Sequence, residues 1–214
     1  MRAKPSTAAI ALTILVLTSG CLGVLSSAST TFEADPADVD SAAASQTGFE
    51  KNGTRDDTIT REVGPDGLSE TVTVVNKVTT YEKSLEIPLL GSMRLGVFSV
   101  VSTPAVEVGG QVFNPIADYS NARLVDLVTD RFGTLSNPEQ VSSRRLQVVG
   151  TETTVTKYAA TTTVEGQEID VFVHVTKVRD GDDFLVGVGV YPQTLDQESE
   201  ILTLLRAIEH PAGS

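Results

Sequence analysis

The stretch Phe184-Leu-Val-Gly-Val-Gly-Val-Tyr191 decides the fold, because two kinds of residue alternate along it. Successive side chains of a β-strand point to opposite faces of the sheet, so Phe184 and the three valines share one face. Leu185, Tyr191 and the two glycines share the other face, where the absence of a side chain lets another element approach the backbone closely. We therefore predict a strand over residues 184–191 with a helix packed against its glycine face.

A helix that could cover this face follows directly in the sequence. Four apolar residues recur at the spacing i, i+3, i+4 and i+7, which is one stripe of a helix: Ile201, Leu204, Leu205 and Ile208. The pattern Thr194-Leu-Asp-Gln197 predicts a capping box at the start of this helix. Arg206 and His210 are basic residues that suit its negative C-terminal end.

Turn and cap signals place the remaining elements. Gly64-Pro-Asp-Gly67 predicts a hairpin, and Gly109-Gly110 turns another strand back. Asp35-Pro36 is a cap followed by proline, the usual start of a helix. We predict strands at residues 56–63, 69–87, 94–106, 111–113, 143–163 with a break at Gly150, and 169–178, and helices at 36–46 and 120–132. The predicted fold class is α+β, an antiparallel β-sheet of about six or more strands with helices packed on it.

Composition limits the function classes. The chain has 214 residues, 40% of them apolar, which is typical of an ordinary globular domain. Its 28 acidic and 16 basic residues give a net charge of −12. Such a surface repels phosphate backbones, so we exclude nucleic acid as a partner. The acidic balance and the absence of tryptophan resemble the proteins of salt-loving archaea.

The N-terminus predicts export and lipid attachment. Arg2 and Lys4 precede the apolar run 8–17, and Thr18-Ser-Gly20 then leads into Cys21, the single cysteine. This is the layout of a signal peptide, and its end resembles the lipobox of lipoproteins, with the leucine one place early at Leu17. We predict that Cys21 carries membrane lipid and holds the protein on the outer face of the cytoplasmic membrane. The predicted segments are a signal peptide at 1–20, a tether at 21–31, a single domain at 32–210 and a tail at 211–214.

An uncleaved membrane anchor is the alternative. Residues 8–25 are mostly apolar and just long enough to span a bilayer. Both interpretations place the body of the protein outside the cell, because positive charge stays inside. With Cys21 used for attachment, no disulfide, cysteine zinc site or cysteine nucleophile can form.

Several segments resemble a family of haloarchaeal lipoproteins of unknown function. The segments that carry the resemblance are 149–158, 171–178, 181–192 and Ile208-Glu-His210, with Phe113-Asn-Pro115 and Tyr119-Ser-Asn121 in support. The family implies no activity. The order of the elements also resembles the PsbP-like fold, whose members are often lipid-anchored or peripheral accessory proteins.

The sequence offers little for catalysis or metal binding. His174 and His210 have no neighbouring ligand in sequence, so we predict a packed histidine in a strand and a helix-end residue. Asp180, Asp182 and Asp183 could offer oxygens to calcium, yet no glutamate completes a calcium loop, and we favour a solvated hairpin turn. No cofactor is predicted. Asn52-Gly-Thr54 is a sequon for N-glycosylation, which we expect in an exposed loop.

Three function classes follow. The favoured one is a non-catalytic binding or accessory module with a membrane-protein or cell-surface partner. The second is an extracytoplasmic enzyme with a carboxylate-based site near Asp118, Tyr119 and Arg123. The third is a small solute-binding subunit, although the chain lacks the two similar halves of a two-lobed binding protein.

Overall fold

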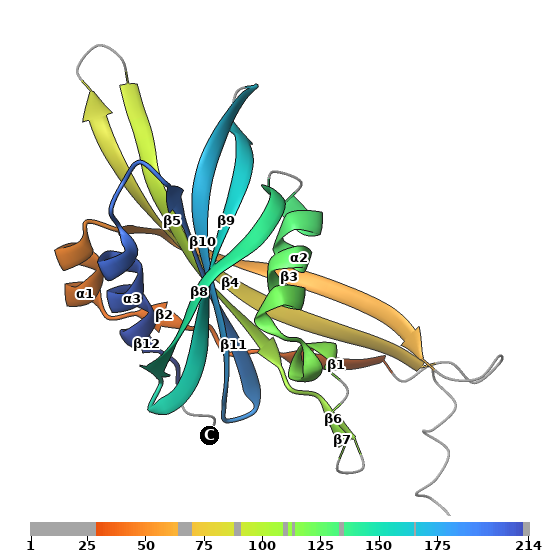
Figure 1. Cartoon of the computed structure of the whole chain (residues 1–214). Coiled ribbons are helices and arrows are strands. Elements are labelled where there is room, and N and C mark those ends of the chain that lie inside the picture. The colour runs from red at the N-terminus through yellow and green to blue at the C-terminus, as the bar shows by residue number, and fades with distance from the viewer. Residues whose placement is uncertain are drawn as a thin grey trace, which may run out of the picture.

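The computed structural model describes residues 29–63, 70–87, 91–108, 111–112, 114–132, 135–164 and 166–211. In chain order these residues form β1 (Ser29–Glu33), β2 (Asp38–Val39), α1 (Ser41–Thr47), β3 (Glu50–Val63), β4 (Glu70–Ile87), β5 (Gly91–Pro104), β6 (Glu107–Val108), β7 (Gln111–Val112), a 3₁₀ turn η1 (Pro115–Asp118), α2 (Asn121–Phe132), β8 (Leu135–Val148), β9 (Thr151–Val164), β10 (Gln167–Asp180), β11 (Asp183–Pro192), α3 (Glu198–Arg206) and β12 (Ile208–Glu209). Figure 1 shows this order in colour.

One eight-stranded sheet organises the molecule, in the order β1-β4-β5-β11-β10-β9-β8 with β3 paired to β4. The predicted α+β class is confirmed, and the hairpin of β3 and β4 is antiparallel as expected. The strand predicted over 143–163 is two strands, β8 and β9, and the predicted break at Gly150 is the turn between them. The short hairpin of β6 and β7 pairs Val108 with Gln111, also as predicted.

Strand β1 corrects two predictions, that the tether extends to residue 31 and that the sheet is antiparallel throughout. Ser29 to Glu33 pair in parallel with Thr71 to Val75 of β4, so residues 29–31 belong to the folded domain. Strand β3 occupies one edge of β4, so β1 and β5 share the other edge. Along β4, the pairing with β1 ends at Val75, and the pairing with β5 starts at Lys77, which lies opposite Ser102. Residues Ser29 to Thr31 are small and polar, and their strand character comes from a partner far along the chain.

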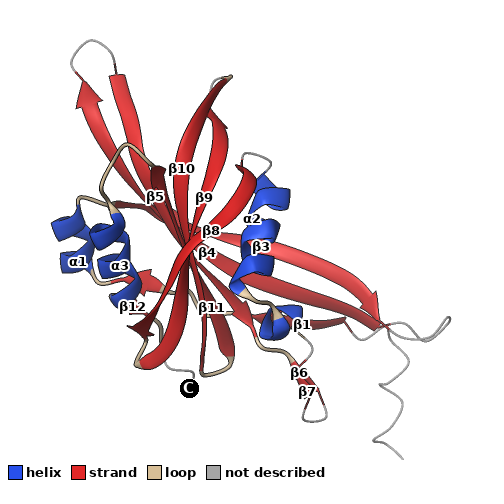
Figure 2. Ribbon diagram, in the orientation of Figure 1, coloured by secondary structure: helices blue, strands red, loops and turns tan. Residues whose placement is uncertain are grey.

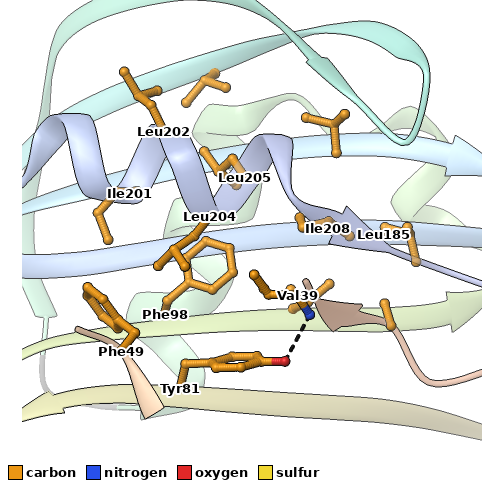
Figure 3. Close-up of a cluster of buried hydrophobic side chains, with 14 of the residues drawn as sticks. Val39, Phe49, Tyr81, Phe98, Leu185, Ile201, Leu202, Leu204, Leu205 and Ile208 are labelled. Carbon is orange, nitrogen blue, oxygen red and sulfur yellow. Dashed lines mark hydrogen bonds between the residues drawn. The ribbon is translucent and has the colours of Figure 1, made fainter. Parts of the chain in front are cut away.

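Helices cover both faces of the sheet (Figure 2). Helices α1 and α3 lie together on one face, and α2 lies on the other. Figure 3 shows the cluster under α3, where Ile201, Leu204 and Leu205 are fully buried. The Val39 N–H donates to the Tyr81 hydroxyl oxygen at 2.8 Å in this cluster. Under α2, the buried residues are Leu124, Val125, Leu135, Tyr158, Ala160, Val171, Val173, Val175, Val186 and Val188.

The glycine face of β11 receives α3 as predicted. A Cβ atom on Gly187 would lie 2.5 Å from Cδ2 of Leu205, closer than real Cβ contacts. Leu185 and Tyr191 on the same face are buried with α3, whereas Val186 and Val188 pack under α2. The alternation in this strand therefore gives it two buried faces, each with its own helical cover.

Two predicted helix starts are wrong. Helix α1 begins at Ser41 and not at Pro36, because Asp38–Val39 pair with Ile208–Glu209, and Asp40 caps the helix by accepting from the Ala43 N–H at 2.9 Å. Gly48 ends it in the left-handed conformation, φ 73°, as glycine at this position predicts. The capping box before α3 does not form. The Gln197 side chain instead donates to the Leu95 carbonyl at 3.2 Å.

Within the described ranges, no helix is both long and apolar enough to cross a membrane.

Candidate functional site

The predicted lipid site, Cys21, lies outside the described residues. The structure describes the chain from Ser29, the first residue of β1, which pairs with Thr71 of β4. Thr71 lies at the end of the sheet where β3 and β4 are joined, as Figure 1 shows on the right. Any tether from Cys21 therefore reaches the domain at this end of the sheet.

The predicted glycosylation residue, Asn52, lies in an edge strand and not in a loop. The ladder between β3 and β4 pairs Lys51 with Tyr81 and Gly53 with Thr80, so Asn52 is the extra residue of a β-bulge. Asn52 is exposed, and β3 has no strand on its outer side among the described residues. The Thr54 hydroxyl lies 3.0 Å from that of Thr79. The bulge leaves the sequon asparagine open to solvent.

The aspartate turn and the last histidine meet in space, which corrects two predictions. His210 Nδ1 lies 3.0 Å from Asp180 Oδ2, and Nε2 lies 3.1 Å from Asp183 Oδ2. The hairpin turn predicted here is present, because Asp180 pairs with Asp183. The His210 side chain is only 2% exposed and that of Asp183 only 8%, so His210 is not a free helix-end residue and Asp183 is not solvated. Each ring nitrogen of His210 therefore lies within hydrogen-bond distance of a carboxylate oxygen. The histidine thus joins the C-terminal segment to the turn between β10 and β11.

Asp183 also holds the segment that follows β1. Its Oδ2 accepts the Asp35 backbone N–H at 2.9 Å and faces the Ser102 hydroxyl at 3.4 Å. One buried carboxylate therefore joins the N-terminal segment, the end of β5 and the C-terminal segment. We name Asp180, Asp183 and His210 the terminal clasp.

The terminal clasp does not favour the calcium interpretation of this turn. The Asp180 and Asp183 carboxylates face His210, and the Asp182 backbone carbonyl accepts the Ala105 N–H at 2.7 Å. In the part of the chain that the structure describes, no group of three His, Cys, Asp or Glu side chains is placed to hold a metal ion.

His174 lies packed in strand β10, as predicted, and is 1% exposed. Its Nε2 lies 3.2 Å from the Tyr191 hydroxyl of β11, and the two rings stack with centroids 5.7 Å apart. Burial lowers the pKa of His174 to about 4, although the Glu198 charge acts in the opposite direction. Burial also raises the pKa of Tyr191. Both groups are therefore neutral near pH 7.

Glu198, the first residue of α3, acts on this pair through its charge and binds two cations directly. Its carboxylate binds Arg144 of β8 and, at 2.7 Å, Lys157 of β9. The hydrogen bond from Lys157 lowers the pKa of Glu198 against the effect of burial. Lys157 Nζ also lies 3.8 Å from the centre of the Phe172 ring. These contacts hold the start of α3 on the sheet.

Two hollows on the described part of the surface are separate from these buried groups. One, of about 400 Å³, lies beside the end of α3 and is lined by Asp40, Gln147, Val149, Gly150, Arg206, Ala207, Ile208 and Glu209. The other, of about 470 Å³, is lined by Glu33, Ala34, Asp35, Pro36, Thr54, Asp56 and Lys77. Lys77 binds Asp56 at 3.0 Å and also binds Glu33, so its charge is already shared between two carboxylates. Neither hollow contains His174, Tyr191 or His210.

The residues proposed for an enzymatic site lie before and at the start of α2 without lining either hollow. Asp118 and Arg123 are exposed, and the Arg123 guanidinium lies 5.8 Å from the centre of the Tyr119 ring. The partly buried contact here involves Lys177, whose Nζ donates to three backbone carbonyls at 2.6 to 2.9 Å. These carbonyls belong to Ile116, Ala117 and Tyr119. Lys177, which the sequence did not single out, therefore fixes η1 on β10.

Comparison with known proteins gives a family and a distant structural similarity. The profile of a family described as "Domain of unknown function (DUF6517)" matches residues 36–209. A search of the curated proteins found no significant match. Among solved structures, the chain is similar to the solution structure of cyanobacterial PsbP (CyanoP) from Synechocystis sp. PCC 6803. That similarity has a TM-score of 0.36 and 13% identity over 90% of this chain and 98% of the other, too weak to support an argument about function.

Proposed function

The chain belongs to the family described as a domain of unknown function (DUF6517), and we propose that it is a lipid-anchored, non-catalytic binding or accessory module. It would be held by Cys21 on the outer face of the cytoplasmic membrane. The observation that carries this proposal is the lipobox-like end of the N-terminal segment, Thr18-Ser-Gly20 before Cys21, which is followed closely by the folded domain at Ser29.

The distribution of ionisable groups supports a non-catalytic role. Catalytic groups with perturbed pKa values usually line a cleft that substrate can enter. Here the strongly perturbed pair, His174 and Tyr191, is buried under α3 and lines neither of the two hollows described above. The terminal clasp is similarly closed, because each ring nitrogen of His210 already faces a carboxylate. These groups act in packing and in joining segments.

The acidic surface supports a place outside the cell in a salty medium, as in the haloarchaeal lipoproteins that the sequence resembles. Self-repulsion from a net charge of −12 is screened when salt is high. A partner for such a surface would be a protein or polymer at the cell surface with basic or neutral contact groups.

Fractionation of intact cells tests the location. The full chain is expected in the membrane fraction and degraded by protease added outside the cells, because the domain is external. Cys21→Ser is the matched control, since it changes one atom of the proposed attachment site. That variant should leave the membrane fraction or accumulate with an uncleaved N-terminus. Protection of the wild-type domain from external protease would overturn the proposal.

A further inference from the structure

The end of the hairpin formed by β4 and β5 presents an exposed apolar pair. Leu85 and Met93 are direct cross-strand partners, and each is 48% exposed. Side chains opposite one another in a ladder share a face and touch, so the two form one patch. Figure 1 shows this hairpin, in yellow at the upper left, extending past the body of the domain. Exposed apolar patches mark membrane or protein contacts. We name Leu85 and Met93 the hairpin pair.

We propose that the hairpin pair inserts into the bilayer surface to which Cys21 anchors the chain, so that the domain lies along the membrane on two contacts. This inference rests on the lipid attachment proposed above. A lipid anchor holds a protein more firmly when the protein itself supplies a second membrane contact.

The length of the tether makes the second contact possible. Eight residue steps separate Cys21 from Ser29, so the chain between them spans at most about 28 Å. Ser29 is paired with Thr71, and β4 runs from there to Ile87 over a length of about 50 Å. The anchor and the hairpin pair are therefore at opposite ends of one long strand. A domain lying on its side brings both ends to the same surface.

The size of the patch favours a bilayer over a protein partner. A specific protein interface buries about 800 Å² on each partner, which two half-exposed side chains fall far short of. A bilayer contact made by an already anchored protein needs much less buried area. The anchor makes this second contact intramolecular and so raises its effective concentration.

The charges around the hairpin pair point to apolar insertion and not to attraction by charged headgroups. Arg94, next to Met93, binds Glu82 at 3.3 Å, and Lys83 binds Glu200 at 2.7 Å. Both of these cations are already neutralised, and the whole chain is strongly acidic. The contact should therefore persist at high salt, where hydrophobic burial is not screened.

Tryptophan fluorescence tests the contact, because the natural chain has no tryptophan. The full chain carrying Leu85→Trp is purified with its lipid and reconstituted in phosphatidylcholine vesicles with brominated acyl chains. We expect blue-shifted emission and at least twofold quenching by the brominated lipid, at low and high salt. Met93→Trp should behave likewise. The matched control is Val141→Trp, because Val141 is 53% exposed in β8 at the far edge of the sheet and should stay unquenched.

Three results would overturn the proposal. Quenching of Leu85→Trp no greater than that of Val141→Trp, in protein that floats with the vesicles, would leave the anchor intact and remove the second contact. A blue shift without vesicles that grows with protein concentration would identify a second copy as the occupant. An unmodified Cys21 by intact mass, with no flotation, would remove the proposed function and this inference together.

Discussion

A Cβ atom placed on Gly189 would lie 2.5 Å from Cγ2 of Ile201, so helix α3 rests directly on the backbone of strand β11. Ile201 is fully buried in this contact. The distance between helix and sheet is therefore set by the absence of a side chain at this position and at Gly187.

Gly189→Ala should destabilise the domain by about 1 to 3 kcal/mol, because overpacking forces α3 away from the sheet. Chemical denaturation followed by circular dichroism measures the loss. The double variant Gly189→Ala/Ile201→Ala should lose less than the sum of the two single changes, since the alanine methyl then fills space that isoleucine left. Strict additivity would show that the two residues do not limit the approach of α3.

The stability of the protein should depend on pH through His174. Its pKa is about 4 when folded and 6.5 in the unfolded chain, so the unfolded chain binds the proton more readily. The contribution of His174 to the free energy of unfolding is complete above about pH 6.5 and is lost as the pH falls toward 4. The total loss is about 3 kcal/mol. Denaturation at several pH values compares the wild type with His174→Gln, which should lack this part of the slope. Equal slopes in the two proteins would contradict the prediction.

Asp183→Asn should destabilise the domain by about 1 to 3 kcal/mol, because a buried carboxylate that accepts from His210 and from the Asp35 N–H loses its charge. Asp182→Asn, at an exposed residue of the same turn, is the matched control and should change stability by less than about 0.5 kcal/mol. Equilibrium denaturation at pH 7 measures both. The terminal clasp would lose its proposed role if the two variants were equally stable.

Asn52 should carry a glycan in the native host, because its bulge position leaves it exposed on the outer edge of β3. Peptide mass spectrometry of protein from the native host should show added sugar mass on residues around Asn52, and Asn52→Gln should remove it. An unmodified Asn52 peptide as the main species would refute this expectation.

Local sequence patterns predicted those helices and strands whose signals lie within their own residues. The alternation over 184–191 gave the two faces of β11, and the apolar spacing of Ile201, Leu204 and Leu205 identified the buried stripe of α3. The turn signal at Gly64-Pro-Asp-Gly67 lies outside the described residues, but the strands on either side of it pair as expected.

Features that depend on distant partners could not be predicted in this way. The strand character of β1 comes from Thr71–Val75, and His210 meets Asp180 and Asp183 only because the segment after β12 lies against the turn between β10 and β11. The capping box failed for a related reason. Gln197 gains a bond to the distant Leu95 carbonyl, which local capping rules do not contain.

The mass of the intact protein purified from membranes is the most direct test of attachment through Cys21. A lipid-anchored protein should begin at Cys21, lack residues 1–20 and carry added lipid mass, whereas Cys21→Ser should show no lipid mass. A wild-type protein that keeps Met1 and an unmodified thiol at Cys21 would show that the chain is not anchored in this way.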